Sequence, residues 1–540
     1  MSNSPLQASH DAQERLHTFL RDPRSYPGPP ARVQVLQTHA SYLVLTPHRV
    51  FKIKKPVNFG FLDFSTLEKR RHFCEREVSL NRRLCPGLHL GVRPISQTTG
   101  RLAFGSGKKI VEYAIEMRRL PERYFLLRRL ARGQISTPEV DAIVATLAQF
   151  YQAQEPTPEI GEWGRVSRLR ISTDENFRQT EEFIGVTITR AAFETIRFFT
   201  AAFYRRHAAL FAARIREGRI RDCHGDLHLE HIHLSPRQLT IYDCIEFNDR
   251  FRYIDVASDA AFLAMDFEFR GHPDLARHFA ARLARALHDP ALLTLLGFYK
   301  CYRACVRGKV ESFQHIAEGV PETERRESRA RAERYFRLAL QYAVCGAEPM
   351  VLIVMGRVGS GKSTLARSLG HELGWEVFSA DRIRKELAGV PLHVRGSASE
   401  RRRLYSEKMT DHTYATLARH AAAEFQQHRG VILDATFAKS RRRLQLCRKL
   451  ERAGVAFSFI EMQAATATLQ QRLAARLHRT GEISDARLED FALLERAYEP
   501  PDEIAASHFM GVKTARTSEA VVLATLKNLA RRRGTKGVRL

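Results

Sequence analysis

Cysteine patterns that form disulfides or bind zinc are missing from this sequence. The 540 residues include 8 cysteines, and no two of them form a Cys-x-x-Cys pair. Cys301 and Cys305 stand four residues apart in an apolar stretch, which is typical of two thiols on one buried helix face. We therefore predict a protein of a reducing compartment, without disulfides or structural zinc.

Signals for secretion and for membrane insertion are missing too. The opening residues, MSNSPLQASHDAQERL, have no basic start followed by an apolar core, so no signal peptide is expected. No apolar run approaches the roughly 20 residues that a membrane-spanning helix needs. The prediction is a soluble, cytoplasmic protein with no membrane partner.

Acidic residues are scarce relative to basic ones, with 60 Asp and Glu against 86 Lys and Arg, and the net charge is +26. Arginines recur along the chain, as at 401–403, 441–443 and 531–533. A nucleic-acid-binding surface usually concentrates such charge on one face. Arginine-rich composition combined with anionic phosphate substrates is therefore the favoured interpretation, and nucleic-acid binding stays open but not favoured.

The most informative stretch that is present begins at Met350. Residues 350–355 are an unbroken apolar run, as expected of a parallel strand buried on both faces, and GRVGSGKST follows at once. This strand, Gly-rich loop and following helix predict a phosphate-binding loop for ATP. Lys362 would add a point charge, and Ser363 would offer a hydroxyl to Mg²⁺. The predicted ATP-binding residues here are Gly356, Arg357, Val358, Gly359, Ser360, Gly361, Lys362, Ser363 and Thr364.

Two carboxylates follow short apolar strands downstream of this loop. Phosphoryl transfer needs a bound metal ion and an oriented acceptor hydroxyl. Asp434, after the strand at 430–433, is the predicted Mg²⁺ contact, and Asp381, after the strand at 377–379, is the predicted general base. Arg384 could hold an acceptor anion. The predicted lid arginines are Arg472, Arg476 and Arg479. The alternatives are strand-end caps for the aspartates and a solvated helix face for the arginines.

Residues 350–510 resemble the small P-loop kinases that include phage-type polynucleotide kinases, gluconate kinase and zeta-toxin-like enzymes. The resemblance rests on GRVGSGKST, on Asp381-x-x-Arg384 and on VILDATF at 431–437. It implies that Asp381 is the general base, that Arg384 contacts substrate and that the arginines of 472–479 form the lid. It does not name the acceptor.

The N-terminal region alternates like a β-hairpin over residues 33–50, with Thr-Pro-His at the bend. The strand at 48–54 places Lys52 and Lys54 on one face and Phe51 and Ile53 on the other. The two lysines are either solvated or directed into a nucleotide-binding cleft.

A helix follows, capped by Ser65 or Thr66 and running toward Pro86. Glu75 and Glu77 are its candidates to meet a strand lysine. This order of hairpin, strand, helix and further strands resembles the small nucleotide-binding lobe of protein kinases.

The segment His224-Gly225-Asp226-Leu227-His228 resembles the HGDxH catalytic loop of aminoglycoside phosphotransferases and choline kinases. The resemblance implies that Asp226 is the catalytic base and that Asp243 ligates Mg²⁺. His231 stands where that family usually has an asparagine as the second metal ligand. Because imidazole is a poorer Mg²⁺ ligand than an amide oxygen, metal binding is altered or this module is slow or inactive.

The same resemblance extends to four further residues. It implies that Lys52 contacts the ATP phosphates and that Glu77 is its ion-pair partner. Asp255 and Asp259 match the family's later aspartates.

The whole order resembles bacterial two-domain proteins in which an aminoglycoside-phosphotransferase-like domain is fused to an ATP-binding kinase domain. The predicted fold is therefore a two-lobed, protein-kinase-like α+β module followed by an α/β P-loop domain with a parallel sheet. The predicted segments are a helix and turn at 1–30, the first module at 31–342, a linker at 343–349, the P-loop module at 350–515, and a helix with a basic tail at 516–540.

The leading functional hypothesis is ATP- and Mg²⁺-dependent phosphorylation of hydroxyls on small molecules, such as a sugar, an amino sugar or a nucleoside. One alternative makes the C-terminal module a 5′-hydroxyl kinase of nucleic acid. Another is a regulatory ATP-binding or ATPase protein whose first module is a pseudokinase. The sequence leaves the acceptor and the oligomeric state open.

Overall fold

The computed structural model describes residues 5–98, 101–346, 348–394, 397–476, 483–514 and 517–533. The chain divides into two compact units, one made of residues 1–169 and 209–296, the other of residues 170–208 and 297–540. The predicted domain boundaries stay predictions. Among the described residues, no helix combines the length and the apolar character needed to cross a membrane.

The first unit opens with a six-stranded antiparallel sheet in the order β1-β2-β3-β6-β4-β5. Its strands are β1 (Gln34–Gln37), β2 (Ser41–Leu45), β3 (Arg49–Lys54), β4 (His89–Thr98), β5 (Arg101–Phe104) and β6 (Lys109–Arg118). Phe51 and Ile53 of β3 pack in a core with Phe19 of helix α1 (Pro5–Arg21). The predicted division of β3 into an apolar face and a lysine face is therefore present.

The prediction of a single hairpin over 33–50 is wrong in part, because the chain turns twice. The bend at 46–48 was predicted, and the bend at 38–40 was missed. At each bend a threonine hydroxyl accepts a backbone N–H three residues later, from Ser41 to Thr38 (3.0 Å) and from Arg49 to Thr46 (2.9 Å). Such threonine turns need no Gly or Pro, so the first bend lacks the usual sequence signal.

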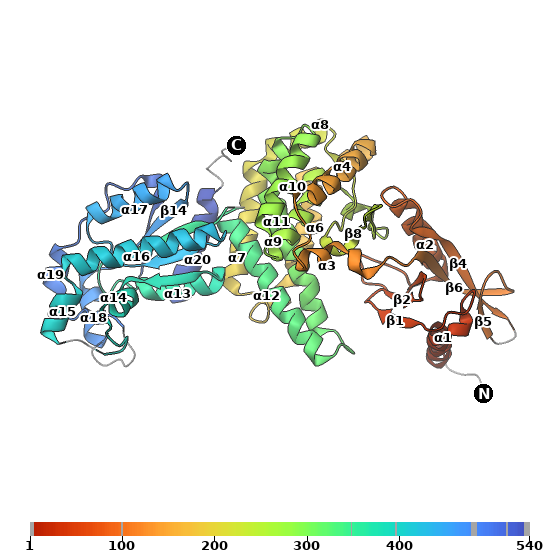
Figure 1. Cartoon of the computed structure of the whole chain (residues 1–540), viewed down its shortest axis with the longest axis horizontal. Helices are drawn as coiled ribbons and strands as arrows, with labels where there is room; N and C mark the ends of the chain where they lie inside the picture. Colours follow the sequence, from red (N-terminus) through yellow and green to blue (C-terminus); the bar gives the residue numbers. More distant parts are fainter. Residues whose placement is uncertain are drawn as a thin grey trace. The chain divides into compact units, whose positions relative to one another are not determined.

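Helix α2 (Leu67–Asn81) contacts β4 and β6 of this sheet (Figure 1). Its cap is Thr66, one of the two predicted cap residues, and the Thr66 hydroxyl accepts the N–H of Lys69 at 3.2 Å. The helix ends at Asn81, before the predicted limit. Glu77 lies on its buried face, and this position brings a carboxylate to the lysine face of β3.

The remainder of the first unit is mainly helical. Its helices include α3 (Leu126–Ala131), α4 (Thr137–Ala153), α5 (Pro158–Glu162), α9 (Val256–Phe269) and α10 (Pro273–Ala286). Two small antiparallel pairs lie among them: β7 (Ile220–Asp222) with β10 (Tyr253–Asp255), and β8 (Ile232–Leu234) with β9 (Leu239–Ile241). The alternation of the sequence predicts strands at 231–234 and 239–243, which correspond to β8 and β9, but it does not predict β7 or β10. Helices α6 (Val166–Thr180), α8 (Ala208–Arg216) and α11 (Ala291–Ile316) each contain a boundary between the two units.

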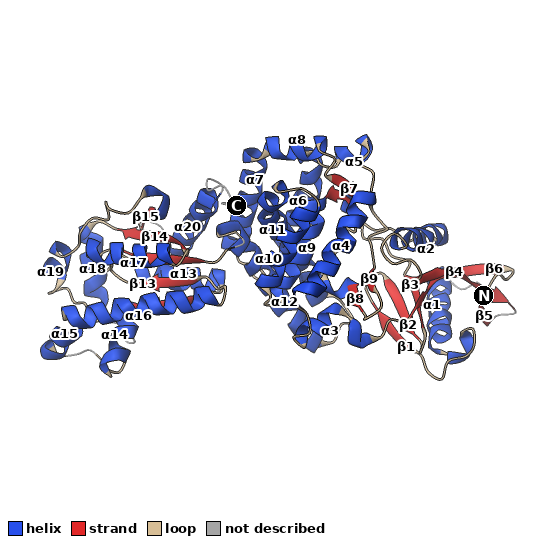
Figure 2. Cartoon of the chain, turned by 45° about the horizontal axis from the view of Figure 1, so that its top comes forward, coloured by secondary structure: helices blue, strands red, loops and turns tan. Residues whose placement is uncertain are grey.

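The second unit contains a five-stranded parallel sheet in the order β12-β13-β11-β14-β15. The strands are β11 (Met350–Met355), β12 (Glu376–Ser379), β13 (Val431–Asp434), β14 (Ala456–Gln463) and β15 (Phe509–Lys513). Strand β11 is central, and four of the five strands coincide with apolar runs from which the sequence predicts strands, at 350–355, 377–379, 430–433 and 456–461. Helix α16 (Glu407–Gln426) contacts β13, and helix α17 (Ser440–Arg452) contacts β14. Figure 2 shows the strands beside these helices.

Other helices of this unit are α7 (Arg190–Arg206), α12 (Glu322–Val344), α13 (Lys362–Leu373), α14 (Ala380–Ala388), α15 (Ala398–Leu404), α18 (Thr466–Arg476), α19 (Phe491–Arg496) and α20 (Ser518–Arg533). The sequence pattern between Thr468 and Ala486 predicts an arginine-rich helix, and α18 corresponds to its N-terminal part. Residues 483–486 are not helical, so that prediction is wrong at its C-terminal end.

Candidate functional sites

The phosphate loop lies between the central strand β11 and helix α13. Gly356, Gly359 and Gly361 have φ values of 134°, 78° and 96°, a region that only glycine enters readily. A Cβ at Gly356 would lie 2.7 Å from the carbonyl oxygen of Met462. Gly361 precedes the first helical residue, Lys362, so the N-terminus of α13 opens directly from the loop. This arrangement presents backbone N–H groups and a helix N-terminus to an anion.

Asp434, the last residue of β13, is buried beside this helix N-terminus, with 5% of its surface exposed. Burial raises its pKa, while the Lys362 charge and a hydrogen bond from Ser363 act in the opposite direction. Lys362 Nζ also donates to the carbonyl oxygen of Arg357 at 2.9 Å. The structure thus brings three predicted site residues, Lys362, Ser363 and Asp434, into one cluster.

The remaining loop residues pack against C-terminal elements of the same unit. Val358 packs on the apolar cluster of Leu469 and Leu473 from α18. Arg357 forms an ion pair with Glu495 at 2.6 Å. Ser360 Oγ is buried and, among the described residues, has no hydrogen-bond partner. The pairing with Glu495 was not predicted, because nothing local in the sequence connects the two residues.

Asp381 lies in the first turn of α14, directly after β12. Its negative charge raises the pKa of Asp434, which places the two carboxylates in one electrostatic environment. Arg384 Nη1 is 3.0 Å from Asp381 Oδ1, and its guanidinium lies 4.5 Å from the ring centre of Tyr405. The predicted base and the predicted acceptor contact therefore bind each other in this structure.

Only one of the predicted lid arginines can be placed. Arg472 donates to the carbonyl oxygen of Ser360 (3.3 Å) and to that of Thr514 (3.2 Å), so it joins α18 to the phosphate loop. Arg479 and the side chain of Arg476 lie outside the described residues. The lid role stays a prediction for all three.

In the first unit, a chain of ion pairs joins β3, α2 and the segment after β9. Lys52 Nζ is 2.9 Å from Glu77 Oε1 and 2.7 Å from Asp243 Oδ1. Burial would raise the pKa of Asp243, but the nearby positive charge of Lys52 lowers it well below its usual range. Asp243 lies two residues beyond β9 with a φ of 64°, which is rare outside glycine and clusters at functional sites. The structure thus brings together Lys52, Glu77 and Asp243.

A second lysine, which the sequence reasoning left without a role, lies beside the first. Lys54 Nζ is 2.7 Å from Glu77 Oε2 and also contacts Glu246 Oε1. Lys54 and Glu77 are each 1% exposed at the side chain. Burial alone would lower the pKa of Lys54, but the carboxylates of Glu246 and Glu77 reverse the effect and raise it. The only sequence signal that Glu246 belongs to this site is its position three residues after Asp243. Glu75, the other predicted candidate, pairs instead with Arg71 on the surface.

The carboxylate of Asp259 holds the backbone of the HGDLH loop in place through hydrogen bonds. The Asp259 carboxylate accepts the N–H groups of His224 (3.0 Å) and Gly225 (2.9 Å), and Tyr151 donates its hydroxyl to it at 2.9 Å. Gly225 has a φ of 87°, and a Cβ there would lie 2.7 Å from the carbonyl oxygen of Phe251. Asp259 therefore positions the loop that carries Asp226.

Asp255, the other late aspartate, belongs to a separate buried cluster. It forms two hydrogen bonds with Arg214, at 2.8 and 2.6 Å, and the opposite side of Arg214 pairs with Asp289 at 2.5 Å. All three side chains are almost completely buried. This cluster ties α8 to the start of α9 and to the loop after α10.

His231 lies between the two carboxylates that the sequence assigns to catalysis and to metal binding. Its Nδ1 is 3.6 Å from Asp226 Oδ2, and its Nε2 is 3.4 Å from Asp243 Oδ2. Burial lowers the pKa of His231 to about 4, with His228 acting in the same direction. A neutral imidazole therefore occupies the space between Asp226 and Asp243 at neutral pH.

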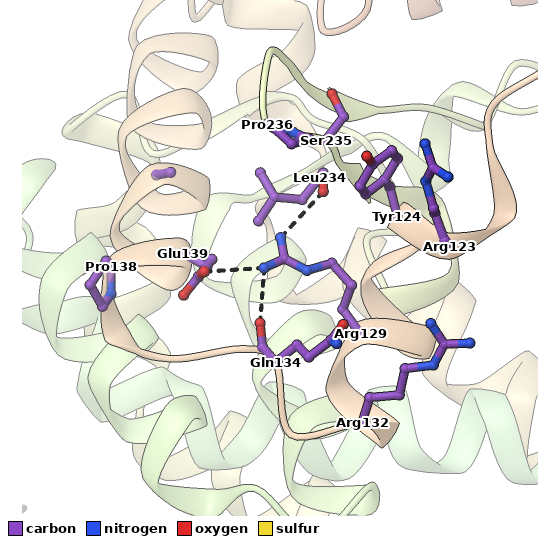
Figure 3. A pocket seen from close by; sticks show the side chains of 11 residues that line it. Arg123, Tyr124, Arg129, Arg132, Gln134, Pro138, Glu139, Leu234, Ser235 and Pro236 are labelled. Atoms are coloured by element: carbon purple, nitrogen blue, oxygen red, sulfur yellow. Dashed lines mark hydrogen bonds and ion pairs between the residues drawn. The ribbon is translucent and has the colours of Figure 1, made fainter.

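A pocket of about 580 Å³ opens elsewhere in this unit (Figure 3). Arg129 lies along it and donates to the carbonyl oxygens of Gln134 and Leu234, at 2.9 and 3.3 Å, while Glu139 accepts at 3.2 Å. The Arg129 guanidinium therefore already forms hydrogen bonds with groups of the protein that line the pocket. Among the described residues that line the pocket, none is a predicted site residue.

Comparisons with known proteins cover both parts of the chain. Residues 351–501 match the AAA domain family, and this range contains the phosphate loop, Asp381 and Asp434. Among solved structures, similar chains include a gluconokinase from Sinorhizobium meliloti 1021 (18% identity, 34% of this chain and 93% of that chain, TM-score 0.26). Another is a sugar kinase from Janibacter sp. HTCC2649 (20% identity, 33% of this chain and 92% of that chain, TM-score 0.24).

Relatives of nearly full length come from mycobacteria. The uncharacterized protein Rv2004c of Mycobacterium tuberculosis (strain ATCC 25618 / H37Rv) is 33% identical over 464 residues, which is 86% of this chain and 89% of the relative. The uncharacterized protein Mb2027c of Mycobacterium bovis (strain ATCC BAA-935 / AF2122/97) matches with the same identity and coverage. The chain therefore belongs to the family of these mycobacterial proteins and carries an AAA domain in its C-terminal part.

Proposed function

We propose that this protein is an ATP-dependent phosphotransferase with two kinase-like modules that phosphorylate hydroxyl groups of small molecules. The observation that carries the proposal is the buried carboxylate of Asp434 beside Ser363 and Lys362, at the point where α13 leaves the phosphate loop. A nucleoside triphosphate needs these groups together: backbone N–H donors and a lysine for its phosphates, and oxygen ligands for its cation.

The candidate site residues of the C-terminal module have the following proposed tasks. The loop glycines and the α13 N-terminus bind the phosphates, and Lys362 adds its charge. The candidate metal ligands near the loop are oxygen atoms of Ser363 and Asp434, and oxygen ligands suit Mg²⁺. When bound, this ion would neutralise charge on the phosphates. Asp381 takes the proton of the acceptor hydroxyl. Arg384 holds Asp381 in place until an acceptor anion competes for the guanidinium.

The N-terminal module is proposed to resemble aminoglycoside phosphotransferases in its use of Lys52, Glu77 and Asp226. The ion pair between Lys52 and Glu77 supports this role, because it fixes a lysine ammonium beside Asp243. Asp226 is the proposed base for the acceptor hydroxyl. Asp243 and His231 are the proposed metal contacts, although an imidazole fits Mg²⁺ less well than an amide oxygen does.

A second candidate function has one specific observation in its favour. The His231 ring lies between Asp226 and Asp243, 3.6 and 3.4 Å from their carboxylate oxygens, where a cation between the two groups would otherwise fit. An imidazole in this position separates the proposed base from the proposed metal ligand, so on this alternative the N-terminal module binds ATP without transferring phosphate and regulates the C-terminal module.

The test is phosphate transfer from labelled ATP to a panel of sugars, amino sugars, nucleosides and oligonucleotides. Lys362→Ala and Asp226→Asn are compared with Lys439→Ala and Asp274→Asn, whose side chains are 44% and 74% exposed. We expect Lys362→Ala to abolish transfer to one acceptor class and Asp226→Asn to abolish transfer to another. Full activity of Asp226→Asn toward every acceptor supports the pseudokinase alternative, and full activity of Lys362→Ala contradicts the proposed C-terminal site.

A further inference from the structure

Three side chains of residue types that can bind metal ions lie close together at the HGDLH loop: those of Asp226, His228 and His231. One ligand atom from each lies within 4.8 Å of the other two. Asp226 Oδ2 is 3.4 Å from His228 Nε2 and 3.6 Å from His231 Nδ1. Ligands at about 2.0–2.1 Å from a tetrahedral zinc ion lie about 3.4 Å from one another. Two edges of a tetrahedron therefore already have nearly the required length.

The two imidazoles are held in place by the backbone and by each other. His228 precedes and His231 ends a single turn of 3₁₀ helix, in which the N–H of His231 donates to the carbonyl oxygen of His228 at 3.0 Å. Asp266 anchors the same turn by accepting the N–H of Leu229 at 3.0 Å. The two rings lie with their centres 3.9 Å apart and their planes tilted by 37°. The cluster is thus built into the fold instead of being assembled from mobile surface side chains.

The surroundings of His231 also match those of a metal-bound histidine. With Nδ1 on a metal, the ring proton resides on Nε2, which faces Asp243 Oδ2 at 3.4 Å. Lys52 holds the other oxygen of Asp243 at 2.7 Å. A carboxylate that accepts the second N–H of a ligating histidine is the usual outer partner at zinc sites. The present hydrogen bond between His231 Nδ1 and the Asp226 carbonyl oxygen (2.9 Å) would be exchanged for the metal bond.

We propose that Asp226, His228 and His231 form a binding site for one transition-metal ion of the zinc class, with Asp243 as the outer partner of His231. Two imidazole nitrogens and one carboxylate favour Zn²⁺, Co²⁺ or Ni²⁺ over Mg²⁺. Three protein ligands leave the fourth position open to water or to a phosphate oxygen. If Asp226 is the base of the proposed phosphotransferase, a bound ion occupies its carboxylate and stops transfer in this module.

The test measures metal binding alone, so that it does not depend on any transferase activity. The full chain, purified without a polyhistidine tag and stripped with a chelator, is titrated with Co²⁺, and Zn²⁺ affinity is measured against a chromophoric chelator. We expect one tightly bound equivalent with the intense visible absorption of four-coordinate Co²⁺. Loss of an outer partner costs about 10–100-fold in affinity, so Asp243→Asn weakens binding by that factor and His231→Asn, which removes a ligand, by more than about 100-fold.

One variant serves as the control. His39→Asn makes the same substitution at an exposed position and is expected to bind as the wild type does. Equal binding by His231→Asn, or only weak absorption of six-coordinate Co²⁺ in the wild type, overturns the proposal. X-ray absorption of the zinc-loaded wild type decides the matter if His231→Asn fails to fold: two imidazoles support the site, and sulfur or only oxygen ligands refute it.

Discussion

Glu77 contacts the buried Lys54 and the partly buried Lys52 at once, and replacing it with glutamine tests whether this network stabilises the first unit. Its two carboxylate oxygens lie 2.9 Å from Lys52 Nζ and 2.7 Å from Lys54 Nζ. Glutamine keeps the size of the side chain and removes its charge. Each lysine then retains one carboxylate partner, Asp243 or Glu246.

The expected cost follows from burial. Removing one partner of a buried ion pair costs about 3–5 kcal/mol, and because both lysines keep a second partner we expect the lower end, about 3 kcal/mol. The control is Glu75→Gln on the same helix. Its pair with Arg71 is 55–59% exposed, and an exposed i,i+4 pair is worth about 0.3–0.5 kcal/mol.

Hydrogen exchange followed by mass spectrometry measures the exchange rates of peptides from each unit separately, so it can locate a loss of stability within this chain. Glu77→Gln should speed exchange in peptides from α2 and β6 by about 100-fold, the factor that corresponds to about 3 kcal/mol. Peptides from α13 and β13 in the second unit should exchange as before. Equal exchange in Glu77→Gln and Glu75→Gln would refute the reasoning, because it would mean that the buried network contributes no more than a surface pair.

Three more predictions follow from other parts of the structure. Gly356→Ala should weaken ATP binding at least about tenfold in equilibrium dialysis, because its Cβ meets the Met462 backbone at a φ of 134°, whereas Gly389→Ala, with open space around it, should not. Arg214→Met should destabilise the first unit by about 3–5 kcal/mol in urea unfolding, because it removes the arginine between buried Asp255 and buried Asp289 and leaves Asp289 only the longer contact with Arg219, at 4.0 Å; a loss below about 1 kcal/mol contradicts this. His231 has a folded pKa of about 4 against 6.5, so the unfolded chain binds more protons between these values. In EDTA, stability should therefore fall as pH drops from about 6.5 toward 4, by up to about 1.4 kcal/mol per pH unit, and more shallowly in His231→Asn.

The features that the sequence predicts well are those coded by neighbouring residues. The phosphate loop needs glycines, a lysine and a serine within one short segment after an apolar strand, and the structure places Lys362 and Ser363 beside Asp434. For the first unit, the periods of the strand and the helix indicate only that a lysine of β3 can meet Glu75 or Glu77. The resemblance to aminoglycoside phosphotransferases singles out Lys52 and Glu77, and the structure pairs them.

The features that were missed depend on residues far apart in the chain. Lys54 and Glu246 are 192 positions apart, and periodicity indicates which face Lys54 occupies but not which carboxylate meets it. Strand β15 follows a stretch without regular alternation and joins the sheet only beside β14. The pairing of Arg384 with Asp381 lies within one helical turn, so the sequence allowed it, but no pattern separates this contact from one with substrate.

The division of the chain into units has a consequence for its biosynthesis. Residues 170–208 belong to the same compact unit as residues 297–540, and the chain completes the first unit between these two segments. Helix α7 contacts both α12 and α20, and Lys527 of α20 pairs with Glu194 of α7 at 3.4 Å across 333 positions.

At synthesis rates of about 5–20 residues per second, α7 leaves the ribosome roughly 15–60 s before α20 exists. Phe193 contacts Phe177 of α6, and Phe199 and Phe203 contact Phe298 of α11, so these rings can be covered before α20 is made. The side of α7 that carries Glu194 and Phe198 meets Lys527 and Arg531 of α20 and remains without these contacts during that time. A truncation at residue 345 would therefore not release an intact first half. It would leave α7 permanently without the helix that completes its packing, and the shortened chain should aggregate more readily than the whole protein.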